Sequence, residues 1–213
     1  MSSKYKIIIF DLDGVLVDTV NMANEYFREK YPTITKEIIN EALAGNFHEE
    51  MEKIKLDHAS TIRTEEEQNE RFAAYTAKKT LAPLFPGILE LLERLQKKEY
   101  ILVINTSAME KNCLPLLEKI GVIKLFDYIG TAEVSKSKVE KFEIIKEKYS
   151  CPKENIIFIT DTLGDVREAK VAGIQTIAVT WGAHDRPYFT REINENLIGV
   201  VDSVEELEQA ISN

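Results

Sequence analysis

The chain lacks the features that suit a protein to a membrane, to an oxidising compartment or to nucleic acid. No apolar run approaches the ~18 residues that a membrane-spanning helix needs, and the N-terminus resembles no signal peptide. The only two cysteines, Cys113 and Cys151, lie far apart without a CxxC spacing, so we expect neither a disulfide framework nor a cysteine metal site. Basic residues are also scarce, with 27 Lys and Arg against 36 Asp and Glu and a net charge of −9.

These absences predict a cytoplasmic protein that binds neither a membrane nor nucleic acid, because both partners carry negative charge. They leave open a phosphorylated small molecule, since a bound metal ion supplies positive charge locally. Oligomeric state is less constrained, and we expect a monomer or a weak homodimer.

What the chain does contain is enough apolar sequence, 44% of 213 residues, for a substantial core. Residues 20–81 show apolar positions at helical spacing and no convincing strand. Beyond them strands and helices alternate, which is typical of a mostly parallel sheet covered on both faces. We therefore predict a Rossmann-like three-layer α/β core from residues 1–19 and 82–213, with an all-helical unit at 20–81 inserted into it.

The most informative segment is the apolar run at residues 7–10, which ends directly at Asp11 and Asp13. Such a run is typical of a buried strand, and residues i and i+2 of an extended chain share a face. The two carboxylates would therefore lie together at the carboxyl end of a strand, where α/β sheets bind ligands. Because close carboxylates repel one another, the pair predicts a divalent-metal site or an acid/base site.

Two further predicted strands also end in polar residues. Thr106 and Ser107 follow the apolar run 101–104, and Asp161 and Asp165 follow the run 156–159. If the strand order brings these ends together, the pocket holds carboxylates for a hard cation and hydroxyl groups for phosphoryl oxygens. A lysine at the start of the helix after residue 135, either Lys136 or Lys138, would complete a set that suits Mg²⁺-assisted phosphoryl transfer.

With these motifs the chain resembles the haloacid dehalogenase superfamily of phosphohydrolases, near the phosphoglycolate phosphatase and β-phosphoglucomutase branch. The family's DxDGxxxD/T motif is matched by residues 11–19, its Ser or Thr motif by Thr106, and its acidic DxxxD loop by Asp161 and Asp165. The helical insertion stands where that family has a helical cap. The third motif departs from the usual Lys-Pro pair, because Lys136 is followed by serine. Counting back from Phe142 without gaps favours Lys136 over Lys138.

The resemblance implies roles for these residues. Asp11 would be the nucleophile that forms a phosphoaspartate, and Asp13 the general acid and base. The implied metal is Mg²⁺. Asp11, Asp161 and the backbone carbonyl of Asp13 would bind it, and Asp165 would support the site as a direct ligand or through another ligand. Thr106, Ser107 and Lys136 would bind the phosphoryl group.

The expected function is Mg²⁺-dependent hydrolysis of a small-molecule phosphate monoester, with a small phosphorylated metabolite as the partner. A phosphomutase of the same fold and a non-catalytic regulator that binds a phosphorylated ligand remain alternatives.

Asn46, His48 and Asn21 are candidates for substrate specificity, against the simpler interpretation of a helix cap and solvent-exposed polar residues. His184 next to Asp185 resembles a catalytic pair, but neighbours in sequence rarely point at each other, and a structural role is favoured.

Overall fold

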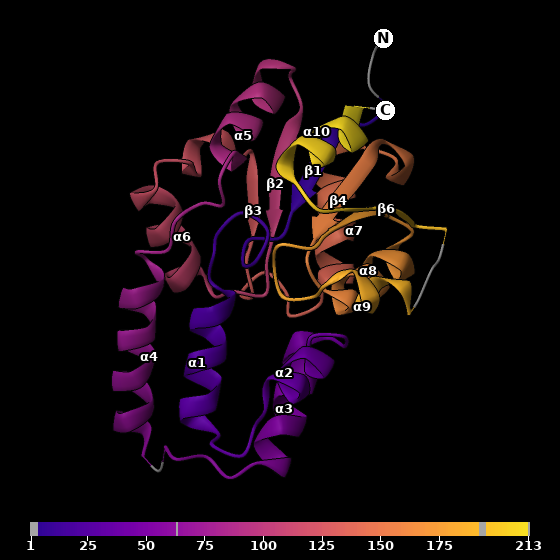
Figure 1. Cartoon of the computed structure of the whole chain (residues 1–213). Coiled ribbons are helices and arrows are strands. Elements are labelled where there is room, and N and C mark those ends of the chain that lie inside the picture. The colour runs from indigo at the N-terminus through magenta and orange to yellow at the C-terminus, as the bar shows by residue number, and fades with distance from the viewer. Residues whose placement is uncertain (1–3, 63, 192–194, 213) are drawn as a thin grey trace.

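A six-stranded sheet forms the centre of the molecule in the computed structural model, which describes residues 4–62, 64–191 and 195–212 (Figure 1). All five strand pairings are parallel, and the strand order is β3-β2-β1-β4-β5-β6. The strands are β1 (Ile7–Phe10), β2 (Ile101–Asn105), β3 (Tyr128–Gly130), β4 (Ile156–Thr160), β5 (Gln175–Val179) and β6 (Leu197–Val201).

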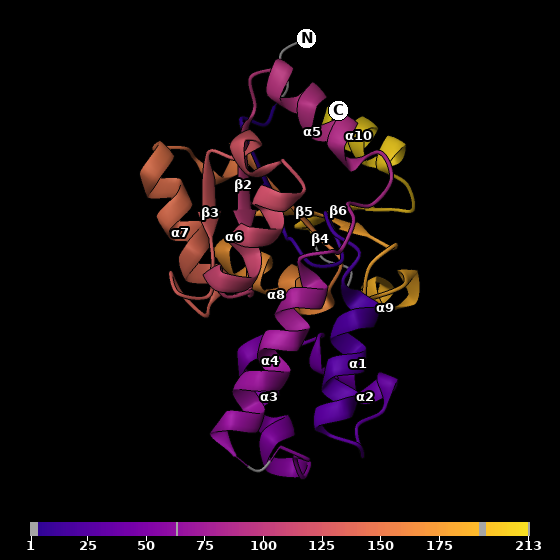
Figure 2. The same ribbon diagram turned by 90° about the vertical axis from the view of Figure 1, so that its left-hand side faces the viewer.

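Helices cover both faces of this sheet, and β1 shows how its residues divide between them. Ile8 and Phe10 pack in a cluster with α5, α6 and α10, whereas Ile7 and Ile9 pack with α7 and α8. Figure 2 shows α5 and α10 on the opposite side of the sheet from α7. The predicted three-layer α/β fold is confirmed. These helices are α5 (Ile88–Lys97), α6 (Glu110–Lys119), α7 (Lys138–Tyr149), α8 (Leu163–Ala172) and α10 (Val204–Ser212).

Four further helices lie together beyond the carboxyl ends of the strands (Figure 1). Tyr31, Ile34, Ile39 and Ile54 form their own small apolar cluster, so this segment has an interior separate from that of the sheet. The helices are α1 (Val20–Lys30), α2 (Lys36–Ala42), α3 (Phe47–Asp57) and α4 (Glu65–Lys79). We call residues 20–79 the helical segment, and its status as a separate cap domain stays a prediction.

Polar N-caps begin three of these helices. The side-chain oxygens of Thr35 and Thr64 accept hydrogen bonds from backbone N–H groups of α2 and α4, as expected of N-cap residues. Asn46 begins α3 by accepting from the backbone N–H groups of His48 and Glu49. The helical segment is therefore held by local capping as well as by its apolar cluster.

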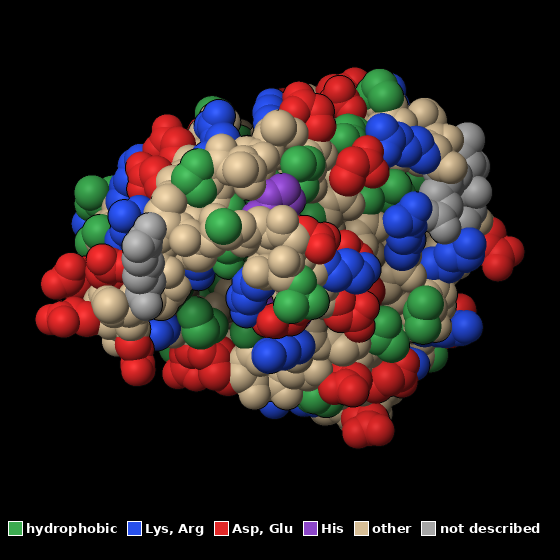
Figure 3. Space-filling view, turned by 90° about the horizontal axis from the view of Figure 1, so that it is seen from below, with side chains coloured by type: hydrophobic (Ala, Val, Ile, Leu, Met, Phe, Trp, Pro, Cys, Tyr) green, Lys and Arg blue, Asp and Glu red, His purple; other side chains and the backbone are tan. Residues whose placement is uncertain are grey.

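Two elements of the core were not predicted, the short helix α9 (Arg186–Thr190) and strand β6. Along β6 burial does not alternate, and Gly199 interrupts the apolar residues, so no period of two marks it as a strand. None of the helices among the described residues combines the length and apolar character needed to cross a bilayer. Figure 3 shows Lys and Arg side chains mixed with Asp and Glu side chains across the face that the helical segment presents.

Candidate active site

Strand β1 carries Asp11 to the centre of the sheet's carboxyl edge. Because β1 pairs with β2 and with β4, Phe10 lies level with Ile104 and Ile159, and the residues that follow these strands are neighbours. Asp11 is only 8% exposed, and its Oδ1 accepts from the backbone N–H of Leu12 at 2.8 Å. Burial raises the pKa of Asp11 to about 7, although Lys138 opposes the shift. The Asp11 carboxyl group is therefore buried away from water, where a nearby positive charge stabilises its ionised form.

Lys138 is that neighbour. Its Nζ lies 3.1 Å from Asp11 Oδ1 and 2.5 Å from Asp165 Oδ2. Burial alone would lower the pKa of Lys138, but the carboxylates of Asp11 and Asp165 outweigh it and raise that pKa. Thr160 Oγ1 also donates to Asp165, at 2.6 Å, so Asp165 holds Lys138 in place beside Asp11, and its role toward a metal ion stays a prediction.

The position of Lys138 corrects the preference for Lys136 that gap-free counting gave. Ser137 caps α7, and Lys138 is the first residue of that helix and is 1% exposed. Lys136 precedes the helix and lies on the wall of the cavity below the site.

Asp161 follows β4 and lies next to β1. Its Oδ2 accepts from the backbone N–H of Ala183 at 2.7 Å, while Oδ1 is buried without a hydrogen-bond partner. Burial and the nearby Asp11 raise the pKa of Asp161 well above its usual value. Gly14 and Gly182 pack so closely on this carboxylate that a Cβ at either position would collide with Oδ2, which explains why both loops need glycine.

This donor set fits a magnesium ion. Among the described residues, no group of three or more His, Cys, Asp and Glu side chains is arranged to hold a metal. The carboxylates of Asp11 and Asp161 would hold the ion together with the backbone carbonyl of Asp13, the group that the resemblance implies for that residue. Mg²⁺ keeps several waters and binds through one or two carboxylates, and the unpartnered Oδ1 of Asp161 is the kind of atom that such an ion satisfies.

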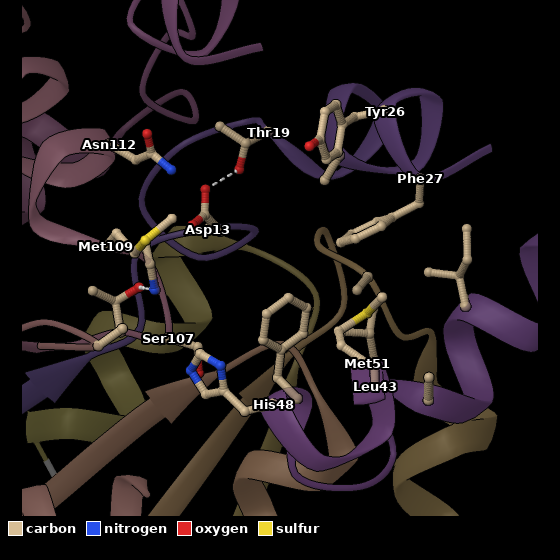
Figure 4. Close-up of a pocket in the computed structure, with 18 of the residues that line it drawn as sticks. Asp13, Thr19, Tyr26, Phe27, Leu43, His48, Met51, Ser107, Met109 and Asn112 are labelled. Atoms are coloured by element: carbon tan, nitrogen blue, oxygen red, sulfur yellow. Dashed lines mark hydrogen bonds between the residues drawn. The ribbon is translucent and has the colours of Figure 1, made fainter. Parts of the chain in front are cut away.

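The side chain of Asp13 is held by the residue that precedes the helical segment and by the last residue of that segment. Thr19 Oγ1 donates to its Oδ1 at 2.6 Å (Figure 4), and Lys79 Nζ donates to Oδ2 at 2.7 Å. The Lys79 side chain is 3% exposed; burial lowers its pKa, but Asp13 and Tyr75 raise it further, so the net shift is upward. No motif marks Lys79, which is one of two adjacent lysines at the end of α4.

Thr106 and Ser107 follow β2 and line the same cavity as Asp11. The loop is fixed by backbone contacts, since Thr106 N–H donates to Gly130 O at 3.0 Å and the buried Lys141 donates to Thr106 O at 2.6 Å. Burial and the neighbouring Lys138 lower the pKa of Lys141 to about 8. The predicted strand ends thus meet, and Lys141 is a supporting residue that the sequence did not identify.

The three specificity candidates have different positions. His48 lines the cavity, and its Nε2 is buried without a partner. Asn21 is exposed on α1 and is not part of the cavity wall. Asn46 caps α3 and donates to Glu168 Oε1 at 3.0 Å, which links the helical segment to α8. Of the three, the structure brings only His48 to the cavity.

His184 has the structural position that the sequence favoured. Its Nδ1 accepts from the backbone N–H of Leu163 at 3.0 Å, and Nε2 lies 2.8 Å from the carbonyl oxygen of Asn40. These partners assign the neutral tautomer with the proton on Nε2. The ring stacks on Tyr188 and joins the loop after β5 to α2.

Comparison with known proteins agrees with this geometry. The family described as haloacid dehalogenase-like hydrolase matches residues 8–179. The chain belongs to this family. The resemblance drawn from the motifs is confirmed, as is the expectation of an enzyme of this hydrolase family.

Named relatives and solved structures cover nearly the whole chain. A phosphoglycolate phosphatase of Pseudomonas syringae pv. syringae is 28% identical over 95% of this chain and 78% of its own length. The pyrophosphatase PpaX of Oceanobacillus iheyensis is 27% identical over 85% of this chain and 86% of its own. CbbY from Rhodobacter sphaeroides, solved with phosphate, superposes with a TM-score of 0.76 at 21% identity over 95% of this chain and 96% of its own.

Proposed function

We propose that the protein is a Mg²⁺-dependent phosphatase that hydrolyses a small phosphate monoester through a phosphoaspartate on Asp11. The observation that carries the proposal is the placement of Asp11, buried at the central strand end between Lys138, Asp13 and Asp161, at the head of a cavity. The curated relatives named as phosphatases support it.

The first step transfers the phosphoryl group to Asp11. An oxygen of the Asp11 carboxylate forms a bond to phosphorus while the ester P–O bond breaks, and Asp13 gives a proton to the departing alkoxide. In the second step Asp13 takes a proton from water, the water oxygen bonds to phosphorus, and the acyl phosphate bond breaks. Inorganic phosphate leaves and the Asp11 carboxylate is restored.

Neighbouring residues hold the transferred group. The Lys138 ammonium and the donors of Thr106 and Ser107 would bind its non-bridging oxygens, where preorganised donors stabilise developing charge. A Mg²⁺ ion held by Asp11, Asp161 and the Asp13 carbonyl would neutralise charge between these carboxylates and the phosphoryl group.

Asp13 is positioned by both ends of the helical segment. Thr19 immediately precedes α1, and Lys79 is the last residue of α4. The two connections between the helical segment and the core therefore meet at the proposed acid and base, which couples the placement of the segment to that of Asp13. This arrangement suits a lid that excludes water and then opens for product release.

The proposal includes a small phosphorylated metabolite as the partner and a cytoplasmic location, with the protein acting as a monomer or weak homodimer. The net charge of −9 and the mixed charges of Figure 3 favour such a partner over nucleic acid.

The test is a screen of the purified protein against phosphometabolites with and without Mg²⁺. Hydrolysis should require the metal and stop reversibly with EDTA. Asp11→Asn should lower kcat by at least about a thousandfold, because the nucleophile is removed, whereas Asp57→Asn, on the exposed end of α3, should leave kcat unchanged. Near-normal turnover by Asp11→Asn would refute the assigned nucleophile.

A further inference from the structure

The cavity below Asp11 has an aromatic wall that the proposed chemistry does not use. The cavity measures about 740 Å³, and its lining runs from the strand ends into the helical segment. Figure 4 shows Tyr26, Phe27 and Met51 directed toward the space in front of Asp13 and Ser107. Six Phe and Tyr rings line it. Five come from three helices, Tyr26, Phe27, Phe47, Phe72 and Tyr75, and the sixth is Tyr31, which follows α1.

These rings are held against one another rather than scattered. The Tyr26 and Tyr75 rings lie 4.7 Å apart between centroids, Phe27 and Phe47 lie 6.2 Å apart, and Phe72 lies 6.4 Å from Tyr75. Tyr26 is fixed further by a hydrogen bond from Gln68 Nε2 to its hydroxyl at 3.1 Å. Such contacts hold π surfaces in place before a ligand arrives, which lowers the entropy cost of binding.

The lysines on the same wall already have partners. Lys30 donates to Oε1 of the neutral Gln68 at 2.7 Å, and Lys55 pairs with Glu52 at 2.5 Å. Lys136, which precedes α7, interacts electrostatically with Glu52.

Lys111 of α6 also lines the cavity, and its Nζ lies over the Phe72 ring, 4.5 Å from its centroid. Glu133 adds another acidic group to the lining. A leaving group with its own carboxylate or second phosphate would have to displace these partners or approach an acid.

The size of the cavity also argues against a small, charged leaving group. A volume of about 740 Å³ falls within the range of pockets that enclose drug-sized ligands, and is far more than a two-carbon acid fills. A small, charged leaving group would leave the rings against water, so their burial would contribute nothing to binding.

We propose that the substrate is a phosphate monoester whose leaving group ends in an uncharged, planar aromatic ring system, of the kind found in nucleoside 5′-monophosphates. The inference rests on the proposed phosphatase function and specifies its substrate class. The phosphoryl group lies at Asp11, the linking arm crosses the cavity, and the ring stacks on the aromatic wall. Stacking on aromatic side chains is worth roughly five- to a hundredfold in affinity per base.

The test compares adenosine 5′-monophosphate with ribose 5-phosphate and phosphoglycolate, each with Mg²⁺. The first two substrates share a phosphorylated pentose and differ in the base. We expect kcat/KM for adenosine 5′-monophosphate to exceed that for each of the others by at least about tenfold. Equal or higher values for ribose 5-phosphate or phosphoglycolate would overturn the ring claim while leaving the phosphatase function intact.

A single substitution tests whether the aromatic wall causes the preference for adenosine 5′-monophosphate. Phe27→Leu keeps apolar volume and removes a ring, so the ratio of kcat/KM for adenosine 5′-monophosphate to that for ribose 5-phosphate should fall at least threefold. The matched control is Phe85→Leu, because Phe85 contacts Trp181 and lies outside the cavity lining; its ratio should not change. A ratio that is the same in Phe27→Leu and in the wild type would also overturn the claim.

Failure of the phosphatase function is distinguishable. If the wild type hydrolyses no monoester with Mg²⁺, the proposed function fails, and calorimetry of both ligands on Asp11→Asn then decides the ring claim. Adenosine 5′-monophosphate binding at least fivefold more tightly than ribose 5-phosphate would support the aromatic site, and equal affinities would refute it.

Discussion

At the scale of single residues, the site depends on how buried charges are paired. Asp11 and Asp165 share Lys138, whereas Asp161 keeps one oxygen without a partner. Burying a charge without a partner is costly, so the sequence maintains this arrangement only where a ligand or ion can compensate it. The buried oxygen without a partner therefore lies where the cation and the phosphoryl group are expected.

The two candidate lysines give the sharpest residue-level prediction. Lys138→Met should lower kcat about 10²- to 10³-fold, the usual cost of removing a donor that stabilises transition-state charge. Lys136→Met removes the same charge from the cavity wall and should lower kcat less than about tenfold. Steady-state kinetics of both variants on one substrate measures the difference. A larger loss of kcat in Lys136→Met than in Lys138→Met would show that Lys136, as first expected from the sequence, binds the phosphoryl group.

The raised pKa of Asp11 predicts how stability depends on pH without metal. An unfolded aspartate loses its proton near pH 4, whereas folded Asp11 keeps it up to about pH 7. Between these values the folded state binds more protons, so this group makes the protein less stable as pH rises. Asp11→Asn cannot ionise and should gain stability relative to the wild type from pH 4 to 7.

Urea unfolding of the two proteins in EDTA, at several pH values, measures that difference. Taking the difference removes the contributions of other groups, including His48 and His184, whose pKa values are lowered mainly by burial. A gap between the two unfolding free energies that stays constant from pH 4 to 7 would show that Asp11 is ionised throughout.

At the scale of elements, sequence patterns predict what local chemistry determines. Thr35 and Thr64 begin helices as their capping side chains suggest, and the apolar run 7–10 forms the buried strand β1. Strand β6 lacks that local signal, since its residues show no period of two. Its pairing with β5 is also irregular, between Thr176 and Ile177. Its placement depends on contacts distant in sequence, which no window of residues contains.

Helix α3 gives an element-level prediction, because Asn46 both caps it and binds Glu168 of α8. Asn46→Ala should lower the free energy of unfolding by about 1 to 2 kcal/mol, the cost of a lost cap plus a lost hydrogen bond. Thr64→Ala, which removes only a cap, should cost less, about 1 kcal/mol. Urea denaturation compares the two.

The position of His48 in the first turn of α3 makes a kinetic readout informative as well. Loosening the start of α3 in Asn46→Ala should raise KM more than it lowers kcat, because His48 lines the cavity and is not one of the residues proposed to react with the phosphoryl group. If Thr64→Ala proved the more destabilising variant, the link between α3 and α8 would contribute no stability.

At the scale of the whole molecule, parallel strands explain why the site could be assembled from sequence. The ends of β1, β2 and β4 are adjacent because β1 is central in the sheet, so motifs some 150 residues apart meet. Thr106, Asp11 and Asp161 were predictable for this reason. Lys79, which comes from α4, was not, since its contact with Asp13 depends on how the helical segment lies against the sheet.

The shape of the cavity is likewise a property of the whole chain. Its lining combines strand ends with α1, α3, α4 and α6, and no single motif encodes the aromatic wall. We therefore expect the family's shared motifs to govern the reaction, and residues outside any motif to govern which leaving group binds.

The central claim is that Asp11 carries the phosphoryl group. Asp13→Asn should slow water attack, since no base activates the water, and allow the phosphoenzyme to accumulate with an activated aryl phosphate. After acid quenching with ³²P-labelled substrate and proteolysis, the account predicts label on Asp11 in Asp13→Asn and none in Asp11→Asn. Label on any other residue, or turnover that proceeds without a labelled enzyme in rapid-quench experiments, would contradict it.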